Sequence, residues 1–335
     1  MGINKFFVFS GRNAQSYLNI TEAALHRLEY SLASGTQANY GAQLQLFVLY
    51  CMKLDIDIEQ LHFKHIIGFI EMLARDNLSY ATIVNYLSGI KTMLKKLNVN
   101  VSPFEHVIIA DMLKACQRTI LTRHKSKYVF TSELMHQLVI TCRVLQHPVV
   151  YRAIFLMAFH GFFRISNLVP TSPYSFLLQK HLARGDVFFS HSGAQVLLKW
   201  SKTLQTATNT KVINLPLIPS SPLCPVTSLQ TYIQAHPSNK NLPFFTISSN
   251  PPKIITQRLV RQALAKVLQA MGLEPAAYGF HVFRRSGATL AFNLNVPLQD
   301  IQAHGTWASQ AVWAYLSTAT NSAVSTAFKH HFTTT

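Results

Sequence analysis

Residues 281–289 read HVFRRSGAT, and this stretch decides how the second half of the chain is interpreted. A histidine is followed three residues later by an arginine and then by a second arginine, after which the chain becomes small and apolar. If Phe283 marks the core direction of a helix, the residues on its stripe are Phe283, Gly287, Leu290 and Leu294. Arg284 then lies about 100° from the stripe and Arg285 about 200° away.

These angles predict different roles for the two arginines. Arg284 lies at the edge of the core, where packing fixes the side chain and aims it at a ligand. Arg285 points outward, toward solvent or a backbone phosphate. His281 falls between them at the mouth of the helix. We therefore expect Arg284→Ala to abolish the chemistry of the site, and Arg285→Ala to weaken binding in a salt-dependent way.

The charge balance predicts a polyanionic partner. The 335 residues hold 30 Lys and Arg against 13 Asp and Glu, a net charge of +17. Residues 151–335 are the more uneven half, because they contain 15 basic residues and only three acids, Asp186, Glu274 and Asp300. A globular chain this basic is typical of proteins that bind nucleic acid. The alternative is a general solubility charge, although acids usually accompany bases on solvated faces.

The same balance argues against metal-dependent chemistry. Nucleases and polymerases that use Mg²⁺ hold it with clustered carboxylates, which the C-terminal half lacks. The four cysteines lie 26 or more residues apart, which argues against a zinc module. The longest apolar stretch, AIFLMAF at 153–159, is far shorter than a membrane span. We expect neither a metal, nor a cofactor, nor a membrane.

Periodicity predicts two domains with mainly α-helical structure and a small antiparallel β-sheet. Residues 1–122 read as a helical domain whose third helix carries Lys91 and Lys95 on a face that is either solvated or turned to a groove. Residues 123–130 form a basic linker, and residues 131–335 a mixed second domain. Ser79 is expected to cap the third helix, Pro103 to begin the fourth, and Thr131 or Ser132 to cap the next one.

Further polar residues interrupt apolar or turn segments of the second domain. Arg164 ends the apolar run FLMAFHGFFR and requires an anionic partner or a route to solvent. Lys202 lies in a polar run between two expected strands, with Lys199 as its neighbouring alternative. Tyr315 follows Gly305 by ten residues in HGTWASQAVWAYLS, where a core role is the alternative.

In this order and spacing, the set resembles the tyrosine recombinase family over most of the chain. The strongest match is the H-x-x-R of HVFRRSGAT, followed 31 residues later by a tyrosine after a G-x-W turn. The motif form is most similar to the enzymes of DIRS-type retrotransposons and Cryptons. The resemblance implies a helical core-binding domain and an α+β catalytic domain.

The resemblance also implies roles for the site residues. Tyr315 would attack a DNA phosphodiester to give a 3′-phosphotyrosine, and Arg164 and Arg284 would hold the non-bridging oxygens. Lys202 would protonate the leaving 5′-oxygen, with assistance from His281. The phosphotyrosine preserves the bond energy, so religation needs neither ATP nor a metal. The remaining basic candidates for DNA contacts are Arg285, Lys91, Lys95, Arg123, Lys125, Lys127 and Lys199.

The sequence departs from the family at three places. The position nine residues before the tyrosine, often His or Trp, is Thr306, and Trp307 and His304 remain the candidates for that role. Asn167 stands where an acid often follows the first arginine, which predicts a looser orientation of Arg164. The third departure is the choice between Lys199 and Lys202.

The expected function is a site-specific DNA recombinase or integrase that acts on double-stranded DNA. The alternatives are an inactive or domesticated DNA-binding relative and an enzyme similar to type IB topoisomerases. After Tyr315, the side chains of Val324, Ala327 and Phe328 share one side of an expected tail helix. In the resembling family such a tail docks on the next protomer of a dimer or tetrameric synapse; packing on its own domain is the alternative. The protein would be nuclear in a eukaryote and otherwise cytoplasmic, at the nucleoid.

Overall fold

The chain divides into two compact units, between His124 and Lys125. This boundary lies inside the segment 123–130 that the sequence predicts as a linker. The computed structural model describes residues 31–120, 128–200, 210–249, 251–307, 310–313, 315 and 316. Arg123, Lys125 and Lys127, the basic residues expected to contact DNA from the linker, lie outside these ranges. None of the helices described has the length and apolar character needed to cross a membrane.

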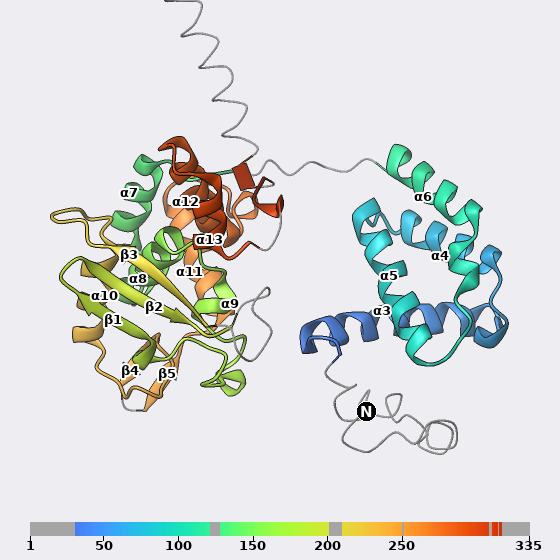
Figure 1. Cartoon of the computed structure of the whole chain (residues 1–335), viewed down its shortest axis with the longest axis horizontal. Helices are drawn as coiled ribbons and strands as arrows, with labels where there is room; N and C mark the ends of the chain where they lie inside the picture. Colours follow the sequence, from blue (N-terminus) through green and yellow to red (C-terminus); the bar gives the residue numbers. More distant parts are fainter. Residues whose placement is uncertain are drawn as a thin grey trace, which may run out of the picture. The chain divides into compact units, whose positions relative to one another are not determined.

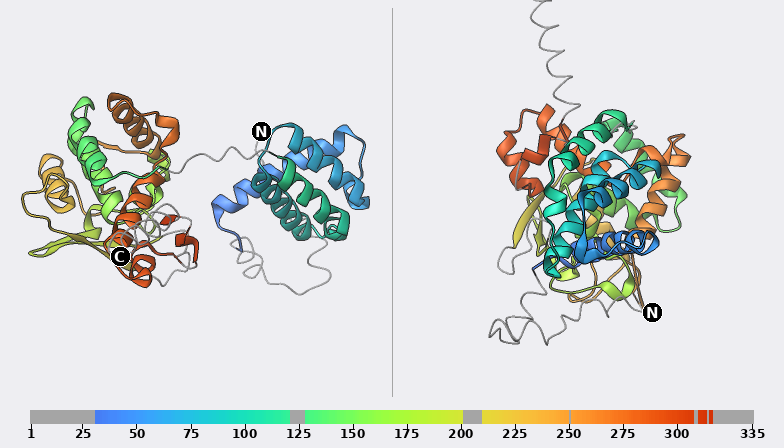
Figure 2. Two further views of the ribbon diagram at one scale, coloured as in Figure 1. Left: turned by 90° about the horizontal axis from the view of Figure 1, so that it is seen from above. Right: turned by 90° about the vertical axis from the view of Figure 1, so that its right-hand side faces the viewer.

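The first unit is a helical bundle around one apolar core (Figures 1 and 2). In the described part its helices are α3 (Ser34–Lys53), α4 (Phe63–Arg75), α5 (Tyr80–Lys96) and α6 (Val107–Thr119). Phe47, Phe69 and Ile83 are fully buried where these helices meet. Phe47 and Phe69 pack edge to face with ring centroids 5.0 Å apart. The apolar stripes of the sequence therefore converge as predicted.

Helices α5 and α6 of this unit begin after residues whose side chains cap them. The Ser79 hydroxyl accepts the backbone N–H of Thr82 at 3.3 Å, so the predicted cap of α5 is confirmed. The predicted start of the fourth helix at Pro103 is wrong. Pro103 lies in a 3-10 turn, and α6 begins at Val107 after His106, whose extended backbone separates the two. The His106 ring nitrogen accepts the N–H of Ile108 at 3.3 Å and supplies the cap.

The second unit is mixed (Figure 1). Its helices are α7 (Ser132–Thr141), α8 (Pro148–His160), α9 (Ile165–Leu168), α10 (Pro225–Ala235), α11 (Gln257–Ala270), α12 (His281–Asn293) and α13 (Leu298–Gly305). Its strands are β1 (Val187–Ser190), β2 (Gly193–Leu198), β3 (Lys211–Pro216), β4 (Thr246–Ser249) and β5 (Pro252–Ile254). Thr131 caps α7 through its hydroxyl, which settles the choice between Thr131 and Ser132.

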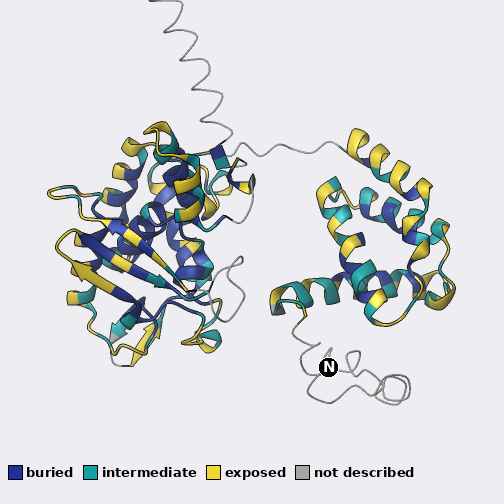
Figure 3. Cartoon of the chain, in the orientation of Figure 1, coloured by how far each residue is buried: buried dark blue, intermediate teal, exposed yellow. Residues whose placement is uncertain are grey.

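The main sheet has the antiparallel order β1-β2-β3. Val187, Val196 and Ile213 pair across it and are buried on one face, while the other face is exposed (Figure 3). The predicted mixture of helices with three short antiparallel strands is confirmed. The small β4–β5 hairpin is an addition that the sequence analysis did not predict.

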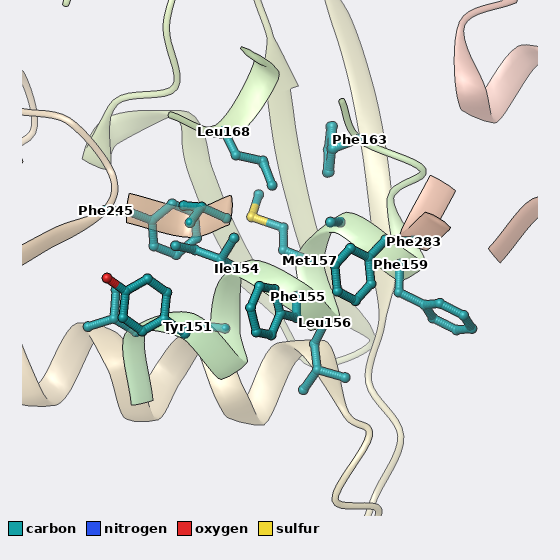
Figure 4. Close-up of a cluster of buried hydrophobic side chains, with 14 of the residues drawn as sticks. Tyr151, Ile154, Phe155, Leu156, Met157, Phe159, Phe163, Leu168, Phe245 and Phe283 are labelled. Carbon is teal, nitrogen blue, oxygen red and sulfur yellow. The ribbon is translucent and has the colours of Figure 1, made fainter. Parts of the chain in front are cut away.

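Helix α8 runs through the centre of the main core (Figure 4). Phe155 on α8 stacks on Phe283 of α12 with ring centroids 5.0 Å apart. The apolar run does not continue to Arg164 as one helix, because α8 ends at His160 and Phe162 adopts a left-handed φ of 50°. Arg164 instead precedes the short helix α9 as its N-cap residue.

Helix α12 is buried on two sides. Phe283 faces the main core, whereas Ala288 faces a second apolar cluster with Phe162, Trp307 and Leu316. A glycine permits this close approach to α8: a Cβ at Gly287 would meet the Phe159 carbonyl oxygen, and the Phe162 ring at 2.7 Å. The sequence HVFRRSGAT therefore places Arg284 between two packed surfaces, in contact with the turn after α8.

We expect Gly287→Ala to destabilise the second unit by about 1–3 kcal/mol, because the added methyl group overpacks the α8–α12 contact. Alanine otherwise favours a helix over glycine, so the sign tests the contact itself. Urea unfolding measures the change. Gly279→Ala is the control, since a Cβ there would meet no atom within 4 Å. A Gly287→Ala variant as stable as the parent would contradict this packing.

Candidate active site

Arg284 is held by backbone carbonyls inside the protein. Its Nη1 donates to the Phe162 carbonyl oxygen at 2.5 Å and its Nη2 to the Gly305 carbonyl oxygen at 2.6 Å. The side chain has an exposed fraction of 1 %. The sequence placed it at the core edge, and the structure buries it further. The guanidinium is thereby fixed between the end of α8 and the end of α13.

The end of α13 is shaped to receive this arginine. Thr306 has a left-handed φ of 57°, and the Trp307 N–H donates back to the Gln302 carbonyl oxygen at 3.0 Å. This turn leaves the Gly305 carbonyl, at a helix C-terminus, free to accept from a cation, which the helix dipole favours. A side chain at Gly305 would collide with the Trp307 ring.

Trp307 and Tyr315 form an aromatic wall beside Arg284. The Arg284 guanidinium lies 3.8 Å from the Trp307 ring centroid and 5.7 Å from that of Tyr315. The two rings meet edge to face at 5.2 Å. Thr289 donates from its hydroxyl to the Tyr315 backbone carbonyl at 3.3 Å, which ties this segment to α12. Trp307 and Tyr315 thus both lie against Arg284.

Arg285 does not point outward, so the prediction from the helical wheel is wrong. The side chain is half-buried, and its Nη1 donates to the Tyr128 carbonyl oxygen at 3.3 Å. Its guanidinium lies 5.8 Å from the Tyr315 ring centroid. The wheel assumed a helix with one buried face, whereas α12 is covered from two sides and by the entering chain at Tyr128.

Arg164 joins the same group. Burial first, and then the charge of Arg164, lowers the pKa of Arg284, whereas Tyr315 partly offsets the lowering of the pKa values of Arg164, Arg284 and Arg285. The backbone N–H of Arg164 donates to Oδ1 of Asn167 at 2.9 Å. Asn167 therefore fixes the backbone of Arg164 rather than loosening it, contrary to expectation. It also donates from Nδ2 to the Trp200 carbonyl oxygen at 3.2 Å.

The three arginines are electrostatically unsatisfied. Burial, then the charge of Arg164, lowers the pKa of Arg284 to about 9, so the guanidinium keeps its charge at neutral pH. Burial also lowers the pKa values of Arg164 and Arg285. No ion pair among the described residues includes any of the three.

Four buried donors in this group find no acceptor in the described part of the chain. They are Nη1 of Arg164, Nε of Arg284, Nε of Arg285 and Nε1 of Trp307. Buried donors are rarely left unpaired in native structures, and each costs free energy when it is. Three guanidinium groups and an indole N–H around one tyrosine suit an anion with several acceptor oxygens.

His281 stands at the rim of this group. Its side chain is exposed at the start of α12. Loss of hydration, followed by the charges of Arg164, Arg284 and Arg285, lowers the pKa of His281. The ring is therefore neutral at pH 7, which leaves it able to accept a proton.

His304 contacts the end of α8 and the turn after it, and so supports the fold. Its Nε2 lies 2.9 Å from the His160 carbonyl oxygen, and its ring meets Phe162 edge to face at 4.7 Å. Burial lowers the pKa of His304 and brings that of His160 to about 4. Of the two residues proposed for the His or Trp position, Trp307 is the one in contact with Tyr315.

The lysines considered for the site lie in different parts of the chain. Lys202 lies outside the described residues. Lys199 forms an ion pair of 2.7 Å with Asp186, and its Nζ also contacts the Leu178 carbonyl oxygen. Lys211, which the sequence analysis missed, donates to the Ala303 carbonyl oxygen near the end of α13. The one sequence feature of Lys211 that indicated a role was its position at the start of an expected strand, directly after the polar run.

The two lysines named in the first unit differ in their contacts. Lys91 forms an ion pair of 2.7 Å with Glu105. Lys95, in the last turn of α5, is exposed. Both residues lie on α5 of the helical bundle.

Comparison with known proteins finds a likeness in fold alone. No protein-family model matches the sequence, and no match was found among curated proteins. Among solved structures, residues 82–397 of the Tn1549 transposon integrase in complex with circular intermediate DNA have a TM-score of 0.57 at 12 % identity. The match covers 88 % of this chain and 92 % of that one.

Two further structures agree. The XerH site-specific recombinase bound to difH substrate has a TM-score of 0.54 at 16 % identity, over 84 % of this chain and 76 % of that one. A lambda integrase dimer bound to a COC′ core site has a TM-score of 0.52 at 13 % identity, over 87 % of this chain and 74 % of that one. The chain therefore has the tyrosine recombinase fold, and the predicted fold class is confirmed.

Proposed function

We propose that this chain is a site-specific DNA recombinase or integrase that cleaves and rejoins DNA through a 3′-phosphotyrosine at Tyr315. The observation that carries the proposal is the group of four unpaired buried donors from Arg164, Arg284, Arg285 and Trp307. The Arg284 and Arg285 guanidinium groups and the Trp307 ring lie beside the Tyr315 ring, and Arg164 interacts with Tyr315 electrostatically. A phosphodiester supplies the acceptor oxygens and the negative charge that this group lacks.

The roles follow from position. Arg164 and Arg284 would hold the non-bridging oxygens and stabilise the charge that develops as the Tyr315 hydroxyl attacks phosphorus. Neutral His281 at the rim would accept a proton or bind the phosphate. Trp307 would donate from Nε1 to a phosphate oxygen. By resemblance Lys202 would protonate the leaving 5′-oxygen, and the phosphotyrosine would then be attacked by a 5′-hydroxyl to close the strand.

The biological setting is part of the proposal. The motif form of HVFRRSGAT and the G-x-W turn supports integration or excision of a DIRS-type or Crypton mobile element. Self-association on DNA through residues after Tyr315, from dimer to tetramer, would provide the second pair of strands. Residues 317–335 lie outside the described ranges. In a eukaryotic host the protein would act in the nucleus, and otherwise at the nucleoid in the cytoplasm.

The nucleophile is tested by trapping the covalent intermediate. Binding duplexes are first selected from a randomised library with the Tyr315→Phe variant, and are then nicked so that the cleaved end diffuses away. We expect wild-type protein to form an adduct that survives denaturing electrophoresis, without ATP or added metal, with DNA attached to the peptide that contains Tyr315.

Tyr315→Phe should abolish the adduct, whereas Tyr174→Phe should not, because Tyr174 is 98 % exposed and takes part in none of the contacts described around Tyr315. DNA binding without any adduct from wild-type protein would favour the inactive DNA-binding alternative. Relaxation of supercoiled plasmid lacking the selected sites would favour the topoisomerase-like one.

Substitution of the two neighbouring arginines should lower the cleavage rate to different extents. We expect Arg284→Ala to lower the cleavage rate by about 10³-fold or more, since it removes a buried positive charge and the unpaired Nε donor that the Phe162 and Gly305 carbonyls hold in a fixed place beside Tyr315. Arg285→Ala should lower it by about tenfold, because Arg285 lies beside Tyr315 but its Nη1 is occupied by Tyr128.

Salt titration of DNA affinity checks the second expectation. A side chain that neutralises a backbone phosphate changes the slope of log Kd against log salt by about one. We expect no such change for Arg285→Ala, and a change near one would restore the original view of an outward residue. Thermal unfolding of both variants confirms that they remain folded.

A further inference from the structure

Asn167 joins two parts of the catalytic unit with one side chain. Its Oδ1 accepts the backbone N–H of Arg164 at 2.9 Å, and its Nδ2 donates to the carbonyl oxygen of Trp200 at 3.2 Å. The residue has an exposed fraction of 4 %. One end of this bridge must accept a hydrogen bond and the other must donate one, which a carboxamide does and an ionised carboxylate does not.

The two ends of the bridge differ in function. Arg164 belongs to the arginine group around Tyr315, where its Nη1 is one of the unpaired buried donors. Trp200 lies two residues after Leu198, the last residue of β2, which pairs with Lys211 at the start of β3. The Lys180 Nζ lies 4.3 Å from the centroid of the Trp200 ring. Asn167 thus sets how far Arg164 lies from the end of the β2–β3 hairpin.

We propose that Asn167 is a positioning residue that fixes Arg164 against the end of β2, and that this place requires a carboxamide rather than a carboxylate. The proposal rests on the proposed DNA cleavage for the step that it serves. The hydrogen-bonded bridge through Asn167 is present in the protein without DNA, so this part of the proposal does not depend on the proposed cleavage.

The requirement for an amide runs against the family resemblance. An acid often stands at this position in the resembling family, so the resemblance predicts that Asn167→Asp is harmless or beneficial. The structure predicts the opposite. An aspartate still accepts from the Arg164 N–H, but its second oxygen faces the Trp200 carbonyl oxygen with no proton between them. The partly buried Trp200 carbonyl then loses its donor and is repelled, so that the end of β2 moves away from Arg164.

The experiment compares Asn167→Asp and Asn167→Ala with wild type, and uses Asn239→Asp as the matched control. Asn239 is exposed, and its side-chain oxygen accepts the Asn241 N–H at 3.1 Å, which an aspartate does equally well. The control therefore makes the same amide-to-acid change where only the acceptor is used. Three quantities are measured: amide hydrogen exchange without DNA, affinity for the selected duplex, and the rate of covalent adduct formation.

In Asn167→Asp we expect the Arg164 amide to stay protected, while exchange at the Leu198–Lys211 end of the hairpin becomes faster. In Asn167→Ala both places should exchange faster. DNA affinity should stay within about threefold in both variants, whereas the rate of adduct formation falls by about 100-fold, as expected for a group displaced by about an ångström. Asn239→Asp should match wild type in all three measurements.

Two results would overturn the proposal. One is an Asn167→Asp variant that forms the adduct as fast as wild type or faster, and the other is unchanged exchange at Leu198 and Lys211 in both Asn167 variants. A parallel loss of affinity and rate would also count against a positioning role, since it indicates general disruption. If wild-type protein forms no adduct at all, the proposed function fails, while hydrogen exchange still decides whether the bridge needs an amide.

Discussion

The burial of one guanidinium on two main-chain carbonyls is the interaction around which the catalytic unit is arranged. Arg284 can reach the Phe162 and Gly305 oxygens only if α12 approaches α8 closely and α13 ends where it does. Gly287 allows the first approach, and the left-handed Thr306 directs the second. Phe162 is itself left-handed. A bulky residue in that region is strained, and such strain tends to be kept where function needs the geometry.

This arrangement leaves positive charge unbalanced inside the protein. Burying a cation is expensive unless an anion accompanies it, and the arginines here meet carbonyl dipoles and aromatic faces instead. Dipoles hold a guanidinium in place without cancelling its charge, whereas a carboxylate would cancel it and compete with an incoming phosphate. The scarcity of acids in residues 151–335 is therefore consistent with the local chemistry as well as with binding to a polyanion.

The sequence predicted what depends on local pattern. The helices of the first unit, the antiparallel strands and the placement of Arg284 against the core follow from periodicity and from interruptions of apolar context. The predictions were wrong or incomplete where a residue's contacts come from segments distant in the sequence. The inward turn of Arg285 depends on Tyr128, and the fixing of Arg164 depends on a hydrogen bond between Asn167 and Trp200, 33 residues away. Lys211 was missed for the same reason, since its partner Ala303 is 92 residues away. The place of Lys202 stays a prediction.

The acceptors that seat Arg284 belong to the main chain, and this has a consequence for divergence. A carbonyl oxygen is present whatever side chain its residue carries, so the arginine demands a backbone path and a little empty space rather than particular neighbours. Most positions around it can then drift freely, as long as a few small residues keep the path open. Contacts of this kind leave no pattern of side-chain identities, and they persist in the fold after sequence similarity has been lost.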